Sequence, residues 1–419
     1  MLRLVLDKLL TIKVFVFFSI LILLLKIAYS FYSGFSGLHF EDWSIAENIV
    51  NNAQYAEFIK IGPTAYKLPV YPLFLSFFMY VFPGFYSESI VICQHLIFFI
   101  IPFLIIKILK IFNKEKAGII AAYIFIFSPA YFYYSNVYES TNLFIPIFLV
   151  WIYTFLKIFK GHYKALNHYI FFGLITAILL LTQVVVAPLV GVLIMSLIVL
   201  RKATFKSILV VACSFVVLYS PWVIRNYTTF DKVILTKTPV WQNIYLSYTP
   251  NANIWNKVNL IPAKNEVVTF KMRSHVDEFK MEEIYKKQVQ DALKGKKEVI
   301  FLKGIQNAII IWTVPSRYFY DNSLGILLGR KLFLLVIHSL TLISLVYYFK
   351  RNKLLAFSFL LLFVAFTMPY VVGHAANMRF KLDFEYFQYM LIGLFLVDYC
   401  KERIKIKNLK EKSKNCLNN

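Results

Sequence analysis

Long apolar runs separated by short polar breaks make up most of the chain. The first run extends from Val14 to Ile27, and nine more follow it. An apolar run of about twenty residues is long enough to cross a bilayer as a helix. The pattern therefore predicts an all-α polytopic membrane protein with about ten spanning helices. The nine later runs are residues 88–106, 117–135, 142–157, 168–182, 184–200, 207–222, 326–348, 354–372 and 384–400.

The polar breaks are of two kinds, and the two kinds alternate along the chain. One kind is short and basic, as between Lys107 and Lys116, and the tail 401–419 is of the same kind. The other kind holds acidic and mixed sequence, and its longest members are residues 33–67 and 223–325. Because basic loops are retained in the cytoplasm, we expect both termini there and the acidic loops outside.

One segment decides whether this alternation holds. Residues 68–83 are apolar but contain three prolines, and counting them as a span would place the later basic loops outside. We expect them to form a helix at the interface, with a short tilted span as the alternative. The first run could be a signal peptide cleaved at Ala28-Tyr29-Ser30. An uncleaved helix fits better, because the rest of the chain is also membrane-embedded.

The charge pattern divides the chain into four parts. Residues 1–222 form an N-terminal transmembrane region, which includes the first outside loop. Residues 223–325 form an outside region that we expect to pack on the membrane part, since its apolar content is modest. Residues 326–400 hold the C-terminal transmembrane helices, and residues 401–419 form a basic cytoplasmic tail.

Composition supports a membrane protein and argues against a nucleic-acid-binding protein and against a domain held by disulfides. Hydrophobic residues make up 59% of the 419 residues, above the roughly 45–50% of soluble domains. The net charge of +23 would suggest nucleic-acid binding in a soluble protein. Here the basic residues lie largely in the predicted cytoplasmic loops, so we expect membrane lipids and no nucleic acid as partners. None of the four cysteines falls in a predicted outside loop, so no disulfide framework is expected.

Three acidic residues are candidates for chemistry in the outside loops. Glu41 and Asp42 follow the first span, and Glu139 lies between two apolar runs. Neighbouring carboxylates can hold a proton at a raised pKa, and one of them could deprotonate an acceptor hydroxyl. Glu139 and Asp42 are also candidate oxygen ligands for a divalent ion such as Mg²⁺ or Mn²⁺. The alternative is that all three are ordinary loop residues in contact with water.

Three basic residues lie at the same predicted level of the membrane. Arg225 directly follows a span, Arg379 precedes one, and Lys67 ends the first outside loop. Such side chains suit a phosphate group, although they could also anchor the chain to ordinary lipid headgroups. Apart from Lys26, the spans carry almost no charge, which disfavours an ion-coupled transporter. The pattern fits an enzyme that uses a lipid-linked phosphate substrate.

Five motifs, in their order along the chain, resemble those of GT-C type membrane glycosyltransferases, close to family 39. That group includes protein O-mannosyltransferases, aminoarabinose transferases of lipid A and lipopolysaccharide-core transferases. Each motif is loose alone, but their order and placement are fairly specific. The motifs are FEDWSIAENI (40–49), GPTAYKLPVYPLFL (62–75), SPAYFYYSNVYEST (128–141), SPWVIRNYTTF (220–230) and HAANMRFKLD (374–383).

The resemblance implies a GT-C-like helical bundle with outside-facing loops and juxtamembrane helices. It also implies a sugar donor carried on polyprenyl phosphate and used at the outer face of the cytoplasmic membrane. By the resemblance, Asp42, with Glu41 as the alternative, activates the acceptor. Glu139 assists or helps to hold a metal, and Arg379 contacts the lipid phosphate. Arg225 lies in a motif common to these proteins without a clear role.

The chain departs from the family pattern in two places. Many relatives have an arginine-proline pair where this chain has Gln183-Val184. Many also have a proline-rich run after the late arginine, where this chain has LDFEYF. The first departure puts one expected phosphate contact in doubt.

Together these observations predict an inverting glycosyltransferase of the cell envelope that acts on a lipid, glycan or protein acceptor, as in lipopolysaccharide assembly. A polysaccharide polymerase or ligase that uses polyprenyl-linked sugars is the alternative enzyme. A lipid or polysaccharide transporter or flippase would need a polar path through the spans, of which the sequence gives little sign. A non-catalytic scaffold would leave Asp42, Glu139 and Arg379 dispensable.

Overall fold

The protein is built from helices, as the apolar pattern predicts. The computed structural model describes residues 8–417 except 251–252, 314–322, 374 and 377. Over these residues no strand occurs, and the only β-type pairing is an isolated bridge between His39 and Tyr138. The helices of the membrane part are α2 (Ile12–Tyr32), α3 (Glu41–Asn52), α4 (Val70–Val81), α5 (Tyr86–Lys110), α6 (Glu115–Ile126), α7 (Pro129–Tyr134), α8 (Thr141–Phe159), α9 (Leu166–Thr182), η1 (Val184–Val186), α10 (Ala187–Val199), α11 (Phe205–Phe230), α16 (Leu324–Arg351), α17 (Lys353–Val372), η4 (Met378–Asp383) and α18 (Glu385–Leu417).

Helices occur at all ten predicted runs, although not all of them are long. Among the described residues, six helices are long and apolar enough to cross a membrane: α2, α5, α8, α11, α16 and α17. The run 117–135 is divided between α6 and α7, and the pair around Gln183 forms the shorter helices α9 and α10. The long helix α18 continues beyond its apolar part into the basic tail. The all-α membrane fold is confirmed, and the exact number of spans stays a prediction.

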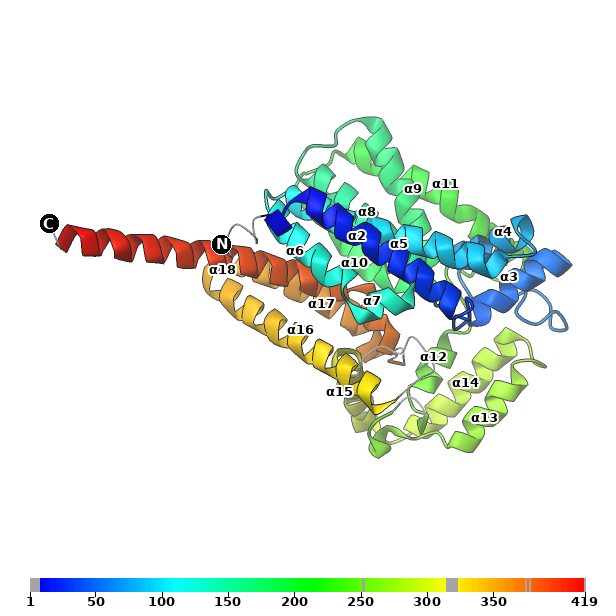
Figure 1. Cartoon of the computed structure of the whole chain (residues 1–419). Coiled ribbons are helices and arrows are strands. Elements are labelled where there is room, and N and C mark those ends of the chain that lie inside the picture. The colour runs from blue at the N-terminus through cyan, green and yellow to red at the C-terminus, as the bar shows by residue number, and fades with distance from the viewer. Residues whose placement is uncertain (1–7, 251–252, 314–322, 374, 377, 418–419) are drawn as a thin grey trace.

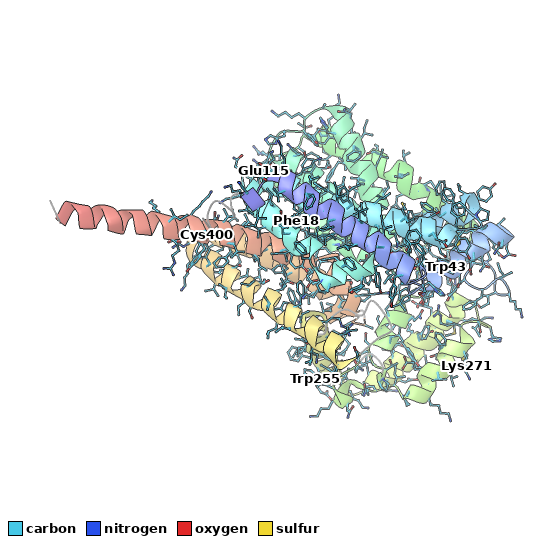
Figure 2. The ribbon with its side chains drawn as sticks, viewed as in Figure 1. Phe18, Trp43, Glu115, Trp255, Lys271 and Cys400 are labelled. Atoms are coloured by element: carbon cyan, nitrogen blue, oxygen red, sulfur yellow. The ribbon has the colours of Figure 1, made fainter. Side chains whose placement is uncertain are left out.

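The two kinds of polar loop lie at opposite ends of the helical bundle. Figure 2 shows Glu115 and Cys400 toward one end and Trp43 toward the other. The helices α3 and α4 lie at the second end, and α18 projects from the first (Figure 1). The ion pair between Lys114 and Asp398, at 2.6 Å, joins two basic regions at the first end. This separation matches the alternation of loops, while the side that faces the cytoplasm stays a prediction from charge.

Small residues allow the central helices to approach closely. A Cβ atom at Gly173 in α9 would lie 2.4 Å from the carbonyl oxygen of Val211 in α11. A Cβ atom at Gly393 in α18 would lie 2.3 Å from the carbonyl oxygen of Ala117 in α6. Such contacts are typical of membrane helices, because association there depends on close packing rather than on escape from water. They fix the loops at the end of the bundle against one another.

The helix α4 occupies the segment predicted to lie at the interface. It has twelve residues, which corresponds to a length of about 18 Å. This is shorter than the roughly 30 Å of a hydrocarbon core. It packs against α3 and the start of α5, at the end of the bundle that carries the first outside loop. Its length and neighbours favour the interfacial position over a span.

The region 223–325 begins as the end of α11 and then forms a small helical unit, the outer unit, defined as the described residues 240–313. Its helices are α12 (Val240–Leu246), η3 (Asn256–Val258), α13 (Ala263–Met272), α14 (Glu278–Leu293) and α15 (Lys297–Thr313). Tyr245, Met281, Tyr285 and Val289 are part of a buried apolar cluster that belongs to the outer unit. The unit also packs on the membrane part through α15 and α17, as expected.

Candidate active site

The first acids of the site lie in the first turn of α3. Asp42 falls on the buried face of this helix with Ile45 and Ala46, because residues three and four apart share a face. The Asp42 side chain is therefore directed inward, and the residue is 3% exposed. Glu41 lies beside it and is half-buried. The N-terminus of a helix stabilises negative charge, so both carboxylates occupy a favourable position.

Lys67 holds the two acids together. Its Nζ atom lies 3.2 Å from Glu41 Oε2 and 3.2 Å from Asp42 Oδ2. Burial by itself would raise the pKa of Glu41, but Lys67, a backbone N–H and Arg273 lower that pKa to about 2. Burial lowers the pKa of Lys67, yet Asp42, Glu41 and Glu139 outweigh it and raise the pKa well above its usual value. Lys67 is therefore a fixed cation, and Glu41 is ionised at neutral pH.

Glu139 and Arg379 form a second buried pair. Glu139 lies in the turn before α8 and is 4% exposed, and its carboxylate accepts a hydrogen bond from Arg379 Nη1. Burial raises the pKa of Glu139 although Arg379 and Lys67 oppose the shift. The guanidinium of Arg379 also lies over the ring of Phe40, 4.8 Å from its centre. Since Phe40 directly precedes α3, this contact brings the second pair to the first.

A close backbone contact joins the loops that carry these acids. The backbone N–H of Tyr138 donates to the carbonyl of Leu38 at 2.8 Å. A Cβ atom at Gly37 would lie only 1.8 Å from the carbonyl oxygen of Asn136, so no other residue fits there without movement. This contact places Glu139 beside the first turn of α3. The structure thus brings together Glu41, Asp42, Lys67, Glu139 and Arg379, five of the six predicted site residues.

The sixth predicted residue, Arg225, lies outside this cluster. Its Nη1 donates to the carbonyl of Thr64 at 2.8 Å, and its Nη2 donates to the carbonyl of Tyr55 at 3.3 Å. Its guanidinium also lies against the rings of Tyr55, Trp222 and Phe230. Arg225 therefore holds the end of the first outside loop against α11, which is a structural task rather than contact with a phosphate.

Replacing Arg225 by lysine should therefore lower stability more than activity. Lysine cannot reach both carbonyls at once and has no flat guanidinium to lie against the three rings, and each lost hydrogen bond costs about 0.5–1.5 kcal/mol. We expect a lower midpoint of thermal unfolding for purified Arg225→Lys in detergent, and no such change for the exposed Arg403→Lys. Unchanged stability with loss of sugar transfer would instead support a phosphate-binding role.

Two functional candidates in the outer part of the site were not predicted from the sequence. Arg273, at the end of α13, forms an ion pair with Glu57. Its Nη2 atom lies 2.7 and 2.8 Å from the two carboxylate oxygens. It also lies 3.7 Å from Glu41 and stacks on the ring of Tyr66, 4.5 Å from its centre. The contact with Glu41 makes the outer unit part of the site. The sequence held no signal for it, since Arg273 lies far along the chain among many other basic residues.

Lys237 is the second cation that sequence reasoning missed. The loop that carries it lies along the first outside loop, because Thr238 N–H donates to the carbonyl of Ala65 at 3.1 Å. Burial, and then the charge of Lys67, lowers the pKa of Lys237 to about 8. No ion pair to it is found in the described part of the chain, whereas Lys67 and Arg379 are both paired with acids. Lys237 is thus the cation in this cluster with most to gain from an added anion.

The two departures from the family pattern meet in one hydrogen-bond network. Gln183, at the break between α9 and η1, donates from Nε2 to Asp383 Oδ2 at 2.7 Å. Thr141 donates to the other carboxylate oxygen at 3.0 Å. Asp383 is fully buried, and burial raises its pKa to about 7 although both hydrogen bonds oppose the shift. The residue that replaces an arginine in this chain therefore supports an acid four residues after Arg379.

Asp383 should make stability depend on pH. A carboxyl group whose pKa is raised to about 7 by folding is protonated in the folded protein and ionised in the unfolded chain across pH 4–7. Its contribution to stability is therefore lost as pH rises through that window. We expect Asp383→Asn to flatten the plot of unfolding midpoint against pH, and the exposed Glu283→Gln to leave it unchanged. An unaltered slope in Asp383→Asn would contradict the assignment.

The acids of this cluster were also candidates to hold a divalent cation. Asp42 lies against Lys67 and Glu139 against Arg379, so ammonium and guanidinium groups take the places that a metal ion would need. Among the described residues, no group of three or more His, Cys, Asp or Glu side chains is arranged to hold a metal. His374, another residue of the late motif, lies outside the described residues. The described side chains do not fit a metal ion as they stand.

The chain is similar to known proteins both in part of its sequence and in its fold. Residues 64–224 match the sequence model of a family described as dolichyl-phosphate-mannose-protein mannosyltransferase. The fold is similar to that of the oligosaccharyltransferase of Archaeoglobus fulgidus in its apo form, with a TM-score of 0.53 and 12% identity over 94% of this chain and 52% of that one. The resemblance to GT-C glycosyltransferases is confirmed.

Two further solved structures of GT-C glycosyltransferases are similar at lower scores. The A. fulgidus oligosaccharyltransferase AglB, in complex with an inhibitory peptide and a dolichol-phosphate, has a TM-score of 0.49 and 14% identity, covering 89% of this chain and 47% of that one. ArnT from Cupriavidus metallidurans, bound to undecaprenyl phosphate, has a TM-score of 0.41 and 9% identity, covering 92% and 77%. The chain spans about half the length of the archaeal oligosaccharyltransferases. No curated protein matches the sequence significantly.

Proposed function

We propose that the chain is a glycosyltransferase of the family 39 type that moves a sugar from a polyprenyl-phosphate carrier to a hydroxyl acceptor. The observation that carries this proposal is the cluster of Asp42, Glu139, Lys67 and Arg379 at one end of a membrane bundle. It offers an acid to receive a proton and cations to receive a phosphate. The match of residues 64–224 to a mannosyltransferase family supports the same class of reaction.

Asp42 is the base in this proposal. Its Oδ2 atom is buried and lies 3.2 Å from the ammonium group of Lys67. A carboxylate oxygen has more than one lone pair, so it can accept from a further donor. An acceptor hydroxyl supplies this donor, and it transfers its proton to Asp42 as its oxygen attacks the sugar.

The cations stabilise the group that leaves. The acceptor oxygen bonds to the anomeric carbon from the face opposite the phosphate, so the configuration inverts. The bond from that carbon to the phosphate oxygen breaks, and its electron pair stays on the phosphate. Arg379 and Lys237, which has no ion pair among the described residues, are the cations that would stabilise this added negative charge. Prearranged charges of this kind often provide the largest part of catalysis.

The carrier's apolar tail has a groove to occupy beside the site. A cavity of about 480 Å³ lies between α16 and α17, and its lining is mainly apolar with Trp312 at one wall. His338 in the same lining lies 2.7 Å from Lys381, two residues after Arg379. A tail in this groove would therefore lie close to Lys381, in the same short helix η4 as Arg379. We place the cluster at the outer face of the cytoplasmic membrane, because the basic loops lie at the other end of the bundle.

The proposal is tested by the choice of donor. Purified full-length protein in lipid nanodiscs is incubated with a radiolabelled sugar on polyprenyl phosphate, on polyprenyl pyrophosphate or on a nucleotide, with lipid, glycan and peptide acceptors. We expect transfer from the monophosphate carrier alone, with inverted configuration at the anomeric carbon in the product. Parallel reactions with EDTA and with added Mg²⁺ or Mn²⁺ decide whether a metal contributes. Transfer only from the pyrophosphate carrier would favour a polymerase or ligase, and transport without transfer would overturn the proposal.

A further inference from the structure

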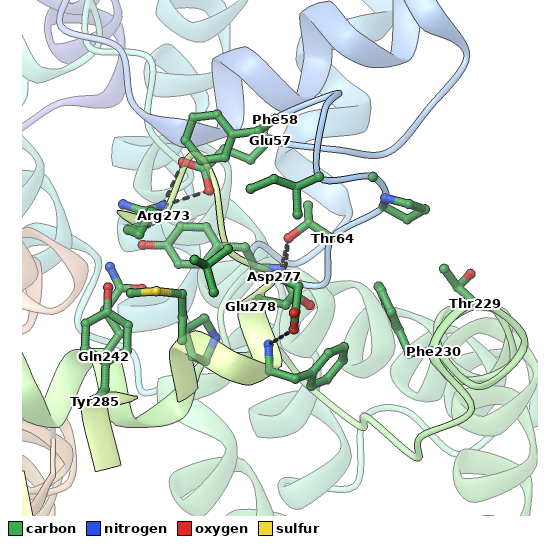
Figure 3. Close-up of a pocket in the computed structure, with 18 residues that line it drawn as sticks. Glu57, Phe58, Thr64, Thr229, Phe230, Gln242, Arg273, Asp277, Glu278 and Tyr285 are labelled. Atoms are coloured by element: carbon green, nitrogen blue, oxygen red, sulfur yellow. Dashed lines mark hydrogen bonds and ion pairs between the residues drawn. The ribbon is translucent and has the colours of Figure 1, made fainter. Parts of the chain in front are cut away.

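A cavity separate from the acid and cation cluster lies between the first outside loop and the outer unit. Its volume is about 250 Å³, slightly below the roughly 300–1,000 Å³ of small-molecule sites. Residues 57–66 form one wall, and α14 with the end of α11 forms the others. Figure 3 shows Arg273, Glu57 and Glu278 at this cavity. It has room for a sugar-sized ligand but not for a long chain.

The cavity is directly next to Glu41. Tyr66 lines it and lies with its hydroxyl 3.5 Å from Glu41 Oε1. Arg273 lines it as well and lies 3.7 Å from the same oxygen. A ligand in the cavity would therefore lie against two side chains that contact Glu41 in the first turn of α3. This is the position that an acceptor would take next to Asp42.

The side chains that line the cavity carry more negative than positive charge. The lining contains one basic residue, Arg273, and three acidic residues, Glu57, Asp277 and Glu278. All three acids already have partners. Glu57 pairs with Arg273, Glu278 accepts hydrogen bonds from Thr64 and from the backbone of Ala65 at 2.9 Å, and Asp277 accepts hydrogen bonds from the backbone of Phe279 and Lys280 at 3.0 Å. Burial raises the pKa of Glu57 to about 7 and also raises that of Glu278. The guanidinium of Arg273 is thus already paired and offers little to an anionic ligand, whereas carboxyl oxygens suit hydroxyl groups.

One buried polar atom of the lining has no partner. Gln242 is 7% exposed and lines the cavity, and its Oε1 atom accepts no hydrogen bond from any residue that the structure describes. Figure 3 shows Gln242 beside Tyr285 at one side of the cavity. A buried carbonyl oxygen without a donor costs free energy, so a hydroxyl-bearing ligand would stabilise it. Phe230 and Tyr285 add aromatic surface to the lining, which suits the C–H side of a sugar ring, while the ring of Tyr66 is stacked on Arg273.

We propose that this cavity binds a neutral sugar unit of the acceptor. The inference rests on the proposed transferase function, because it assigns the acceptor a glycan end rather than an anionic lipid headgroup. Carboxylates, a free amide oxygen and aromatic faces together match the hydroxyl groups and apolar face of a pyranose. The cluster with Asp42 then receives a hydroxyl of this sugar from the direction of Tyr66.

Binding without donor tests the cavity separately from the reaction. Purified full-length protein in nanodiscs is mixed with lactose, N,N′-diacetylchitobiose, an anionic chondroitin disaccharide or a lysine-rich serine peptide, and binding is measured by saturation-transfer NMR. We expect the neutral disaccharides to bind. Gln242→Leu should weaken that binding about tenfold, since it removes the acceptor oxygen. Gln290→Leu, exposed on the same outer unit, is the matched control.

A second variant guards against a folding defect in Gln242→Leu. Thr229 is exposed and lines the cavity, so Thr229→Trp should block it without removing a buried contact. Neutral sugar binding that is lost in Thr229→Trp supports the proposal, and binding equal to wild type in both variants overturns it. Binding of the peptide or the anionic disaccharide in place of the neutral sugars also overturns it. Intact sugar binding with no transfer from any carrier would overturn the transferase proposal instead.

Discussion

Replacing Asp42 by asparagine is expected to lower the rate of sugar transfer by about 10²–10⁴-fold while the protein remains folded. Asparagine keeps the shape of the side chain but cannot receive the acceptor's proton. Lys67 retains its ion pair with Glu41 at 3.2 Å, so the first outside loop keeps its position. The measurement is the initial rate of transfer in nanodiscs with saturating polyprenyl-phosphate sugar.

The matched control for this variant is Glu47→Gln on the same helix. Glu47 is exposed, and the glutamine oxygen can still accept the hydrogen bond from Trp43 that Glu47 receives at 2.7 Å. Its transfer rate should equal that of wild type. A wild-type rate in Asp42→Asn with an inactive Glu41→Gln would move the base to Glu41. Undiminished transfer in both Asp42→Asn and Glu41→Gln would eliminate the catalytic assignment.

Replacing Arg379 by methionine is expected to damage both stability and transfer. Glu139 would be left as a buried carboxylate without its partner, which costs about 3–5 kcal/mol when an ion pair is buried. The same change removes a cation from the position where the leaving phosphate develops charge. We therefore expect a lower unfolding midpoint and a transfer rate reduced by about 10²–10³-fold.

The double variant Glu139→Gln with Arg379→Met separates these two effects. Without the acid, the loss of the guanidinium no longer leaves a buried charge, so the unfolding midpoint should recover most of the loss. Transfer should remain low, because the phosphate still lacks Arg379. Recovery of both stability and transfer in the double variant would show that Arg379 acts only through Glu139. Binding of a polyprenyl phosphate without sugar, measured by native mass spectrometry, gives an independent readout of the phosphate contact.

Much of this molecule could be predicted from its apolar pattern and charges. Helices occur at all ten apolar runs, and the two acids that follow the first run lie in the first turn of α3. The acids and cations next to these runs converge because the alternation of loops puts them at one end of the bundle. Glu139 and Arg379 form an ion pair although 240 residues separate them in the chain.

The remaining part of the site depends on tertiary contacts that no local pattern encodes. Arg273 reaches Glu41 only because the outer unit packs against the first outside loop. Lys237 is brought in by contacts of its loop, among them the backbone hydrogen bond between Thr238 and Ala65 and the hydrogen bond from Trp222 to the carbonyl of Thr236. Arg225 has the right residue type and position for a phosphate contact, but carbonyl oxygens of the first outside loop occupy its donors. The types of the site residues and their level in the membrane were predictable from the sequence, but the residues that they contact were not.

The departure at Gln183 illustrates the same limit. From the sequence it could only be described as a missing arginine. In the folded chain its amide donates to Asp383, which lies in the second departing segment. The two departing segments therefore contact each other in the folded chain, and the sequence alone does not reveal this contact.

The site draws on residues from positions 41 to 379, so nearly the whole length of the chain contributes to it. During synthesis, Asp42 and Lys67 emerge early, while Arg379 is added only after α17 has been made. A ribosome-bound or prematurely terminated product therefore has its base without the guanidinium that would accept the departing charge. Competence for transfer should consequently arise late, once the final helix has been inserted and the outer unit has docked.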